Sequence, residues 1–314
     1  MWILLAGVFV SCQKDVLKSV DDVCSVMEDD VFKEYCLGSF DANCDGILSM
    51  EEAAQVKTIS ISDRRRLTSL KGIEYFSNLE ELFCRNNQLT SLNVTRNINL
   101  TSLFCSSNKL TSLDVTKCSK LIYLDCLLNE ITSLDVSRCP ELYYLDCGAN
   151  KLSSLDLSKN TKLYHLRCQI NNLSSLDVSK NTKLHFLMCY ANSISSLDVS
   201  MLTDLETLYC GTSSLSSLDV TKNVKLEKLE CEGAKLTSLD TSGNNQLRYL
   251  NCGANKLTSL DFSSNPELLE IYCPNNNLTS LDVTKNTKLT SCICNPQAGG
   301  TITVVGWNGK TTIF

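Results

Sequence analysis

Oxygen-bearing side chains recur at alternating positions of one short segment in the N-terminal part of the chain. Counted from Asp41, loop positions 1, 3, 5, 9 and 12 carry oxygen atoms, position 6 is Gly46 and position 8 is aliphatic. This spacing is that of an EF-hand calcium loop, because Ca²⁺ takes about six to eight oxygen ligands and the glycine permits a sharp turn. The ligands that the motif predicts are Asp41, Asn43 and Asp45, the carbonyl of Ile47, Ser49 through water, and Glu52 with two oxygens.

Helices must flank such a loop on both sides. Residues 31–40 can form the entering helix, whereas residues 51–57 allow only a short exiting helix. Regulatory EF-hands occur in pairs that open an apolar groove, and the sequence shows a single loop of this type. We therefore expect bound Ca²⁺ to stiffen an N-terminal cap and not to act as a sensor. An accidental match of the motif is the alternative.

The side chains that support catalysis are scarce. The two histidines, His165 and His185, come without the base-and-orienter arrangement that activates a serine or cysteine nucleophile. As a zinc pair they would lack further obvious ligands. The net charge of −6 argues against a nucleic-acid partner. We expect neither an enzyme nor a nucleic-acid-binding protein.

Cysteines mark a regular repeat. Within the turn from Leu79 to Asn99, Leu82 and Cys84 alternate with outward residues and predict a short strand, and Asn87 occupies a corner where its amide can bond backbone groups. Stacked strands would hold the cysteine Cβ vectors parallel, so we expect buried thiols and no disulfide ladder. The eleven cysteines lie 21 residues apart, at Cys84, Cys105, Cys126, Cys147, Cys168, Cys189, Cys210, Cys231, Cys252, Cys273 and Cys294.

A fixed period of about 20–29 residues with a leucine pattern is typical of a leucine-rich repeat, in which each turn stacks on the preceding one. The predicted fold is an α/β solenoid, mostly β: a right-handed coil of 21-residue turns with a parallel concave sheet, preceded by a small helical EF-hand-like cap. The expected segments are a signal-like leader (1–12), a helical region with the calcium loop at 41–52 (13–58), an atypical capping turn (59–78), eleven repeats (79–295) and a C-terminal β-hairpin cap around Asn308 and Gly309 (296–314).

The first dozen residues indicate export. Trp2 to Val10 form an apolar run that is too short to span a bilayer but suits a signal-peptide core. Ser11 and Cys12 follow, and this pair resembles the lipobox of bacterial lipoproteins. The resemblance implies lipid attachment at Cys12, a membrane contact through that lipid alone, and a place in the outer membrane or at the cell surface. The missing basic residues before the apolar run depart from the pattern, and a cleaved signal peptide or a buried helix is the alternative.

The repeat itself is seen most fully from Leu163 to Lys183. It resembles the 21-residue cysteine-ladder repeat of internalin J, a bacterial surface adhesin, over about two-thirds of the chain. With the lipobox-like cysteine and the EF-hand-like loop, the chain is also similar to leucine-rich-repeat lipoproteins of diderm gut bacteria. The resemblance implies an adhesin-like binding module of the cell surface or envelope. A structural envelope spacer without a specific ligand is the alternative function.

Ligands of leucine-rich repeats meet the outward residues of the strands, where this sequence concentrates its aromatic residues. Rings beside a few charges suit protein hot spots or sugars, although aromatics also stabilise sheets without any ligand. The residues that we assign to a protein or glycan ligand are Phe104, Tyr123, Asp125, Tyr144, Asp146, His165, Arg167, Phe186, Met188, Tyr190 and Tyr209.

Two polar columns should bond the backbone. Aspartates recur from Asp114 to Asp282, and each should accept a hydrogen bond from the following Ser or Thr amide; a row of weak calcium sites is the alternative. The corner asparagines that begin at Asn87 are interrupted at Ser213 and Ala234. Those two turns should therefore lose amide-to-backbone bonds.

A second corner begins with Asn97. Cys118 and Cys139 replace this asparagine in successive turns and should stack as neighbours. A disulfide between them is an open alternative to two buried thiols.

Overall fold

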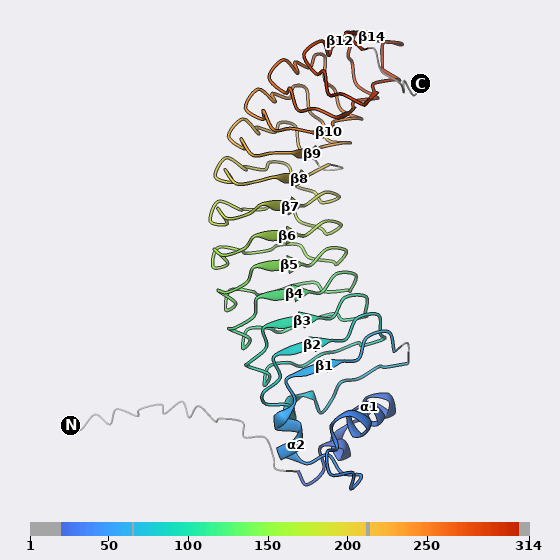
Figure 1. Cartoon of the computed structure of the whole chain (residues 1–314), viewed down its shortest axis with the longest axis vertical. Helices are drawn as coiled ribbons and strands as arrows, with labels where there is room; N and C mark the ends of the chain where they lie inside the picture. The colour runs from blue at the N-terminus through green and yellow to red at the C-terminus, as the bar shows by residue number, and fades with distance from the viewer. Residues whose placement is uncertain (1–19, 65, 212–213, 308–314) are drawn as a thin grey trace, which may run out of the picture.

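The computed structural model describes residues 20–64, 66–211 and 214–307. The chain winds into a stack of similar turns that runs from short helices at the N-terminal end to the C-terminal end and curves along its length (Figure 1). Among the described residues, no helix is both long enough and apolar enough to cross a membrane.

Each turn contributes one strand to a parallel sheet. The sheet has twelve strands, ordered β1 to β11 and then β13. The cysteine spacing predicted eleven; the additional strand is β1, from the residues before the regular repeats, where Ile59 pairs with Leu82. The strands are β1 (Thr58–Ser60), β2 (Glu81–Phe83), β3 (Ser102–Phe104), β4 (Tyr123–Asp125), β5 (Tyr144–Asp146), β6 (His165–Arg167), β7 (Phe186–Met188), β8 (Thr207–Tyr209), β9 (Lys228–Glu230), β10 (Tyr249–Asn251), β11 (Glu270–Tyr272) and β13 (Ser291–Ile293).

Leucines and cysteines fill the interior of the coil. Leu82 and Leu103 at the strand centres are fully buried, as are Cys84 and Cys105. Burial raises the pKa of the Cys84 thiol to about 12, because a thiolate would lose its solvation there. Every described cysteine is a free thiol. The prediction of buried thiols that act as small apolar side chains is confirmed for the ladder.

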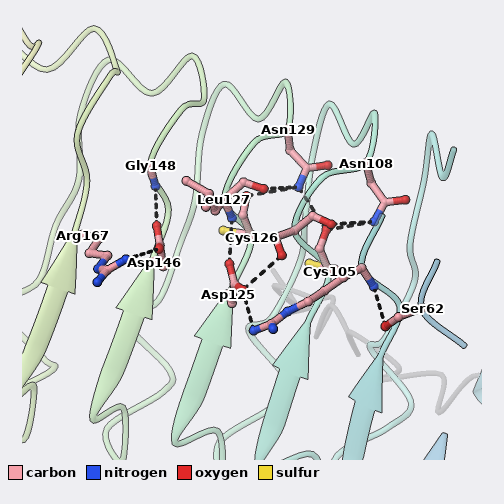
Figure 2. A network of polar contacts seen from close by, with 12 residues as sticks. Ser62, Cys105, Asn108, Asp125, Cys126, Leu127, Asn129, Asp146, Gly148 and Arg167 are labelled. Carbon is pink, nitrogen blue, oxygen red and sulfur yellow. Dashed lines mark hydrogen bonds and ion pairs between the residues drawn. The ribbon is translucent and has the colours of Figure 1, made fainter. Parts of the chain in front are cut away.

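Corner asparagines tie each turn to the preceding one. The Asn108 side-chain amide donates to the carbonyls of Cys84 at 2.9 Å and Cys105 at 3.0 Å. Its Oδ1 accepts from the Leu89 amide at 3.0 Å. Asn129 repeats these bonds one turn further on (Figure 2). The prediction that these side chains satisfy buried backbone groups is therefore confirmed.

The second corner uses the asparagine amide as a donor in most turns. Asn160 donates to the carbonyl of Cys139 at 2.9 Å. Where Cys118 and Cys139 replace the asparagine, their Sγ atoms lie 3.8 and 3.6 Å from backbone carbonyl oxygens of preceding turns. Both are free thiols, so the disulfide left open by the sequence does not form in this structure.

The aspartate column bonds the backbone as predicted. Asp114 accepts from the Thr116 amide at 2.9 Å, and Asp177 accepts from the Ser179 amide at 2.9 Å. The same contact, two residues apart, recurs at every aspartate of the column up to Asp282. Each carboxylate therefore closes its own turn.

Short helices cover the N-terminal end of the coil: η1 (Val23–Val26), α1 (Asp30–Phe40), α2 (Met50–Gln55) and η2 (Ile73–Tyr75). Asp29 is the N-cap residue of α1, because its Oδ1 accepts from the Val31 amide at 2.9 Å. Its Oδ2 accepts from the amide and hydroxyl of Thr68, at 2.6 and 2.8 Å. One carboxylate therefore joins α1 to the first turn. The predicted entering helix is present, and the short exiting helix ends at Gln55, just before β1.

The C-terminal end of the described chain forms a second, smaller sheet. β14 (Thr303–Val305) pairs in parallel with β12 (Ser280–Asp282), and so adds one rung to a second, two-stranded sheet. The hairpin expected around Asn308 and Gly309 lies outside the described residues.

Candidate ligand-binding face

Outward side chains of the short strands form columns on one face of the sheet, here called the sheet face. The ring centroids of Tyr144 and His165 lie 4.8 Å apart, and those of His165 and Phe186 lie 4.1 Å apart, with nearly parallel planes. Tyr123 is 40% exposed, and the other three rings are half-buried. Four consecutive rungs thus carry rings at the first strand position, and we call them the aromatic column: Tyr123, Tyr144, His165 and Phe186.

A second stack of rings lies one residue earlier in each turn. The centroids of Tyr143 and Tyr164 are 4.9 Å apart, and those of Tyr164 and His185 are 4.1 Å apart. Tyr123 meets Tyr143 edge to face at 6.3 Å, which links this stack to the aromatic column. The second stack was not among the residues predicted to contact a ligand, although its 21-residue spacing is the same signal that identified the aromatic column.

The two aspartates assigned to the ligand are buried beneath the sheet face. Asp125 and Asp146 are 6% and 2% exposed. Asp125 accepts hydrogen bonds from the Ser106 hydroxyl and the Leu127 amide, both at 3.1 Å. Figure 2 shows both carboxylates turned toward the loops that follow their strands. Asp125 and Asp146 therefore position the face and contribute little surface to it.

Burial shifts the pKa values of two neighbouring residues, Asp146 on β5 and His165 on β6. It raises the pKa of Asp146 to about 6, while the Gly148 amide at 3.1 Å opposes this rise. It lowers the pKa of His165 to about 4, with a further contribution from Arg167. The Arg167 Nε donates to His165 Nε2 at 3.0 Å, and an Arg167 Nη1 lies 3.9 Å from Asp146. His165 is consequently a neutral imidazole at neutral pH, and Arg167 carries the local positive charge.

Arginines also lie over aromatic rings of the sheet face. The Arg85 guanidinium is 4.4 Å from the centroid of Phe104, which stacks on Phe83 at 5.0 Å. The Arg167 guanidinium is 5.2 Å from the centroid of Phe186. These cation–π contacts favour the observed positions of the two arginine side chains on the face.

A known protein family matches the repeats of this chain. The family model described as At1g61320/AtMIF1, LRR domain, matches residues 43–209, more than half of the chain. The chain belongs to the leucine-rich-repeat family. No curated protein matches this leucine-rich-repeat chain.

Solved structures support the same assignment. The functional domain of InlJ from Listeria monocytogenes, which includes a cysteine ladder, is 36% identical, with a TM-score of 0.83 and coverage of 93% of this chain. This match confirms the likeness to internalin J that the cysteine spacing indicated. The chain spans 63% of the length of that InlJ structure. The likeness to lipoproteins of gut bacteria stays a prediction.

Two more distant structures share the fold alone. The internalin InlF from Listeria monocytogenes is 21% identical, with a TM-score of 0.72, and the match covers 92% of this chain and 94% of InlF. The plant peptide hormone receptor RGFR1, in complex with RGF2, is 20% identical, with a TM-score of 0.69 and coverage of 78% of this chain and 44% of the receptor.

The C-terminal part of the assigned face contains a hollow. Met188, Tyr190 and Tyr209 are half-buried, and the two tyrosines line a cavity of about 310 Å³ together with Glu230 and Glu232. Neither glutamate was assigned from the sequence of this leucine-rich-repeat chain. The signal that could have found them is their spacing, because Glu230 and Glu232 lie 21 residues after Tyr209 and Gly211 at the same two outward positions of the repeat.

The predicted calcium loop has an all-oxygen donor set. The Asp41 carboxylate accepts from the Gly46 amide at 2.9 Å, and Gly46 has the positive φ of 81° that the sharp turn requires. Asp45 Oδ2 accepts from Asn43 Nδ2 at 2.9 Å. Glu52 Oε1 reaches back across the loop and accepts from a backbone amide near its start, at 2.9 Å. The residue types and the turn therefore suit a hard cation.

The same loop shows a competing arrangement. Glu52 Oε2 accepts from the amide and hydroxyl of Ser49, at 2.9 and 2.8 Å, and the Ser49 hydroxyl in turn caps α2. Within the part of the chain that the structure describes, no group of three or more His, Cys, Asp or Glu is arranged to hold a metal ion. Ca²⁺ binding at Asp41, Asn43, Asp45, Ile47, Ser49 and Glu52 stays a prediction. Cys12, the expected lipid attachment, lies outside the described residues.

Proposed function

We propose that this chain is a binding module that recognises a protein ligand through its sheet face. The observation that carries the proposal is the aromatic column, in which four consecutive rungs place partly exposed rings side by side. Aromatic side chains provide large contact areas at little entropic cost and are enriched in binding hot spots. The second stack, with Tyr143 39% exposed, broadens this surface.

Ring geometry favours a protein over a glycan. His165 stacks between Tyr144 and Phe186, so both faces of its ring are covered. A sugar binds best against an open ring face, whereas the exposed ring edges and tyrosine hydroxyls suit protein side chains and backbone. The plant receptor of the same fold, whose structure contains RGF2, is a case of a leucine-rich-repeat protein with a bound partner.

The alternative is an envelope spacer whose rings only stabilise the sheet. A screen against a panel of extracellular-matrix proteins and a glycan array separates the two functions. We expect a protein ligand whose binding is lost in the double variant Tyr144→Ala and Phe186→Ala. Tyr272→Ala is the control, because Tyr272 is a half-buried outward ring of the same sheet on β11 and is not among the residues assigned to the ligand.

Two results would contradict a binding role of the aromatic column. If the double variant binds as the wild type does, or if it loses stability without any effect on a ligand, the rings serve the sheet alone. A hit on the glycan array that depends on Tyr144 would keep the face but change the ligand class.

A structural calcium site at the N-terminal cap is the second part of the proposal. It is supported by the oxygen donors of the loop, the positive φ of Gly46 and the approach of Glu52 to the start of the loop. Ca²⁺ bound there would hold α1 and α2 together at the end of the coil. The role is mechanical, because the loop stands at the end of the sheet and away from the aromatic column (Figure 1).

The proposed location is the bacterial outer membrane or cell surface, with a lipid at Cys12. Support comes from the signal-like leader and from the similarity to InlJ. A module of this kind binds its ligand without chemical change, and we propose no catalytic activity. Labelling of cells with a radioactive or clickable fatty acid tests the anchor: wild-type chain should incorporate the lipid, and Cys12→Ala should not.

A further inference from the structure

Gly211 allows the backbones of two successive turns to approach closely beside the sheet face. It belongs to a column of positions two residues beyond each strand end, which carries Tyr190, Gly211 and Glu232 in successive turns. A Cβ atom at position 211 would lie 2.4 Å from the backbone oxygen of Glu232, so only glycine fits. Because stacked strands are about 4.8 Å apart, the backbones at Tyr190 and Glu232, two turns apart, are separated by roughly 10 Å.

Gly211 also lines the cavity of about 310 Å³. The walls of this cavity are the rings of Tyr190 and Tyr209 and the carboxylates of Glu230 and Glu232. Burial raises the pKa of Glu230, Lys228 opposes this rise, and the nearby Glu232 charge adds to it. The cavity thus combines aromatic walls with a partly buried carboxylate beside a second one, which is a favourable environment for a cation.

A neighbouring residue of the chain already shows this affinity. The Lys228 ammonium lies 5.0 Å from the ring centroid of Tyr209 and 4.3 Å from that of Tyr249. It sits beside the cavity and is not among the lining residues. Its single positive charge stands against the two carboxylates, so a net negative charge is left for a ligand to neutralise.

We propose that this cavity binds a cationic side chain, arginine or lysine, of the protein ligand. A guanidinium group suits it best, because the planar group can stack on a tyrosine ring and donate to a carboxylate at the same time. The inference rests on the proposed function and adds a specificity site to it: the aromatic column supplies contact area, and the cavity selects a ligand with a basic residue at the matching position.

The test uses N-acetylarginine amide as the probe and the full chain as the receptor. Titration is followed by the ¹H–¹⁵N resonances of Gly211 and Gly253, which lies next to Glu232 across the sheet through the Gly233 to Gly253 bond at 3.0 Å. We expect saturable shifts for the wild type. Glu230→Gln and Glu232→Gln should each weaken binding by about five-fold or more, since each loses one charge-assisted hydrogen bond.

Two controls make the test specific. Glu206→Gln removes an exposed carboxylate of the preceding turn that does not line the cavity, and it should leave the affinity unchanged. N-acetylcitrulline amide has the shape of the arginine probe without its charge, and it should give no saturable shift. Unshifted resonances elsewhere in each variant show that the fold is intact.

The proposal is overturned if the arginine probe gives no saturable shift, if citrulline binds as well as arginine, or if both glutamine variants bind as the wild type does. None of these results touches the aromatic column, whose role is tested with the Tyr144 and Phe186 variants. Failure of the cavity and failure of the sheet face are therefore distinguishable.

Discussion

Arg85 and Asp125 form an ion pair that skips one strand of the sheet. Arg85 follows β2 and Asp125 ends β4, and the guanidinium crosses the ring of Phe104 on β3 to bring Nη2 within 2.7 Å of Oδ2. The aspartate is buried, whereas the arginine side chain is 41% exposed. The pair therefore joins three successive turns at the N-terminal part of the sheet face.

Loss of Arg85 should cost more than loss of the whole pair. Arg85→Met leaves a buried carboxylate without its counterion, and we expect it to lower the free energy of unfolding by about 1–3 kcal/mol. Arg85→Met combined with Asp125→Asn should recover most of this loss, because the amide still accepts from Ser106 or Leu127. Urea unfolding of the wild type, Arg85→Met, Asp125→Asn and the double variant measures the coupling; strictly additive losses would contradict a buried ion pair.

Asp146 and His165 should respond to pH in opposite directions. The folded-state pKa of Asp146, about 6, lies above its usual 3.8. Between these values the folded state holds more protons than the unfolded state, so the free energy of unfolding falls as the pH rises from about 4 to 6. The folded-state pKa of His165, about 4, lies below its usual 6.5. Between these values the unfolded state holds more protons than the folded state, so the free energy of unfolding rises as the pH rises from about 4 to 6.5.

Single variants should expose these opposing contributions. Relative to the wild type, Asp146→Asn should become more stable from about pH 4.5 to 7, and His165→Gln less stable, each by about 1–2 kcal/mol. Asparagine keeps the acceptor for the Gly148 amide. Differences between unfolding curves at the two pH values isolate the two groups from the exposed carboxylates. Parallel pH profiles of all three proteins would show that neither group is perturbed.

Ala234 interrupts the corner asparagines, and restoring the amide should stabilise the coil. At the matching positions, each asparagine accepts from the leucine or isoleucine amide 19 residues earlier and donates to the carbonyl three residues earlier. Ala234→Asn would offer these bonds to Leu215 and Cys231. We expect a gain of about 1–2 kcal/mol and slower hydrogen exchange at Leu215.

Ala254→Asn is the matched control for this substitution. Position 254 lies beside the corner asparagine and has a positive φ of 52°, which asparagine tolerates, so its effect should stay within about 0.5 kcal/mol. In the wild type, amides of residues 214–235 should exchange faster than those of flanking turns. Uniform protection along the coil, or equal gains for both variants, would contradict this role of the corner amide.

Ca²⁺ should raise the melting temperature of the cap without altering the repeats. Added CaCl₂ should stabilise the wild type, and EDTA should reverse the effect, because ligand binding to the folded state shifts unfolding. Asp45→Ala removes one oxygen ligand and should abolish the response, while Asp21→Ala, at an exposed acid outside the loop, should not. Circular dichroism of the repeats should be the same with and without Ca²⁺. An unchanged melting temperature at millimolar Ca²⁺ would refute the site.

The regular features of this fold follow directly from the sequence. Each turn contacts only its neighbours, so one period determines the register of Leu82, Cys84 and Asn87 in every rung. The stacking of Tyr144, His165 and Phe186 follows from the same register. Local hydrogen bonds, such as that from the Thr116 amide to Asp114, join residues two positions apart and could also be predicted from the sequence.

The irregular features could not be predicted in this way. Burial of Asp125 depends on Arg85, which reaches across two rungs, and sequence spacing does not show how far a long side chain bends. The cavity beside Tyr209 depends on how close Gly211 and Glu232 of successive turns lie, and not on a motif. The parallel pairing of β14 with β12 is a tertiary contact between separate segments, which local sequence does not encode.

One substitution tests the binding role of the sheet face most directly. Thr207 is a half-buried first-position residue next to Phe186, and Thr207→Glu adds a charge to the face without removing a ring. Ser174→Glu places the same charge at an exposed position off the strands. For the protein ligand from the panel, Thr207→Glu should raise the dissociation constant at least about ten-fold at an unchanged melting temperature, while Ser174→Glu should not. Equal affinities of both variants and the wild type would contradict a ligand on this face.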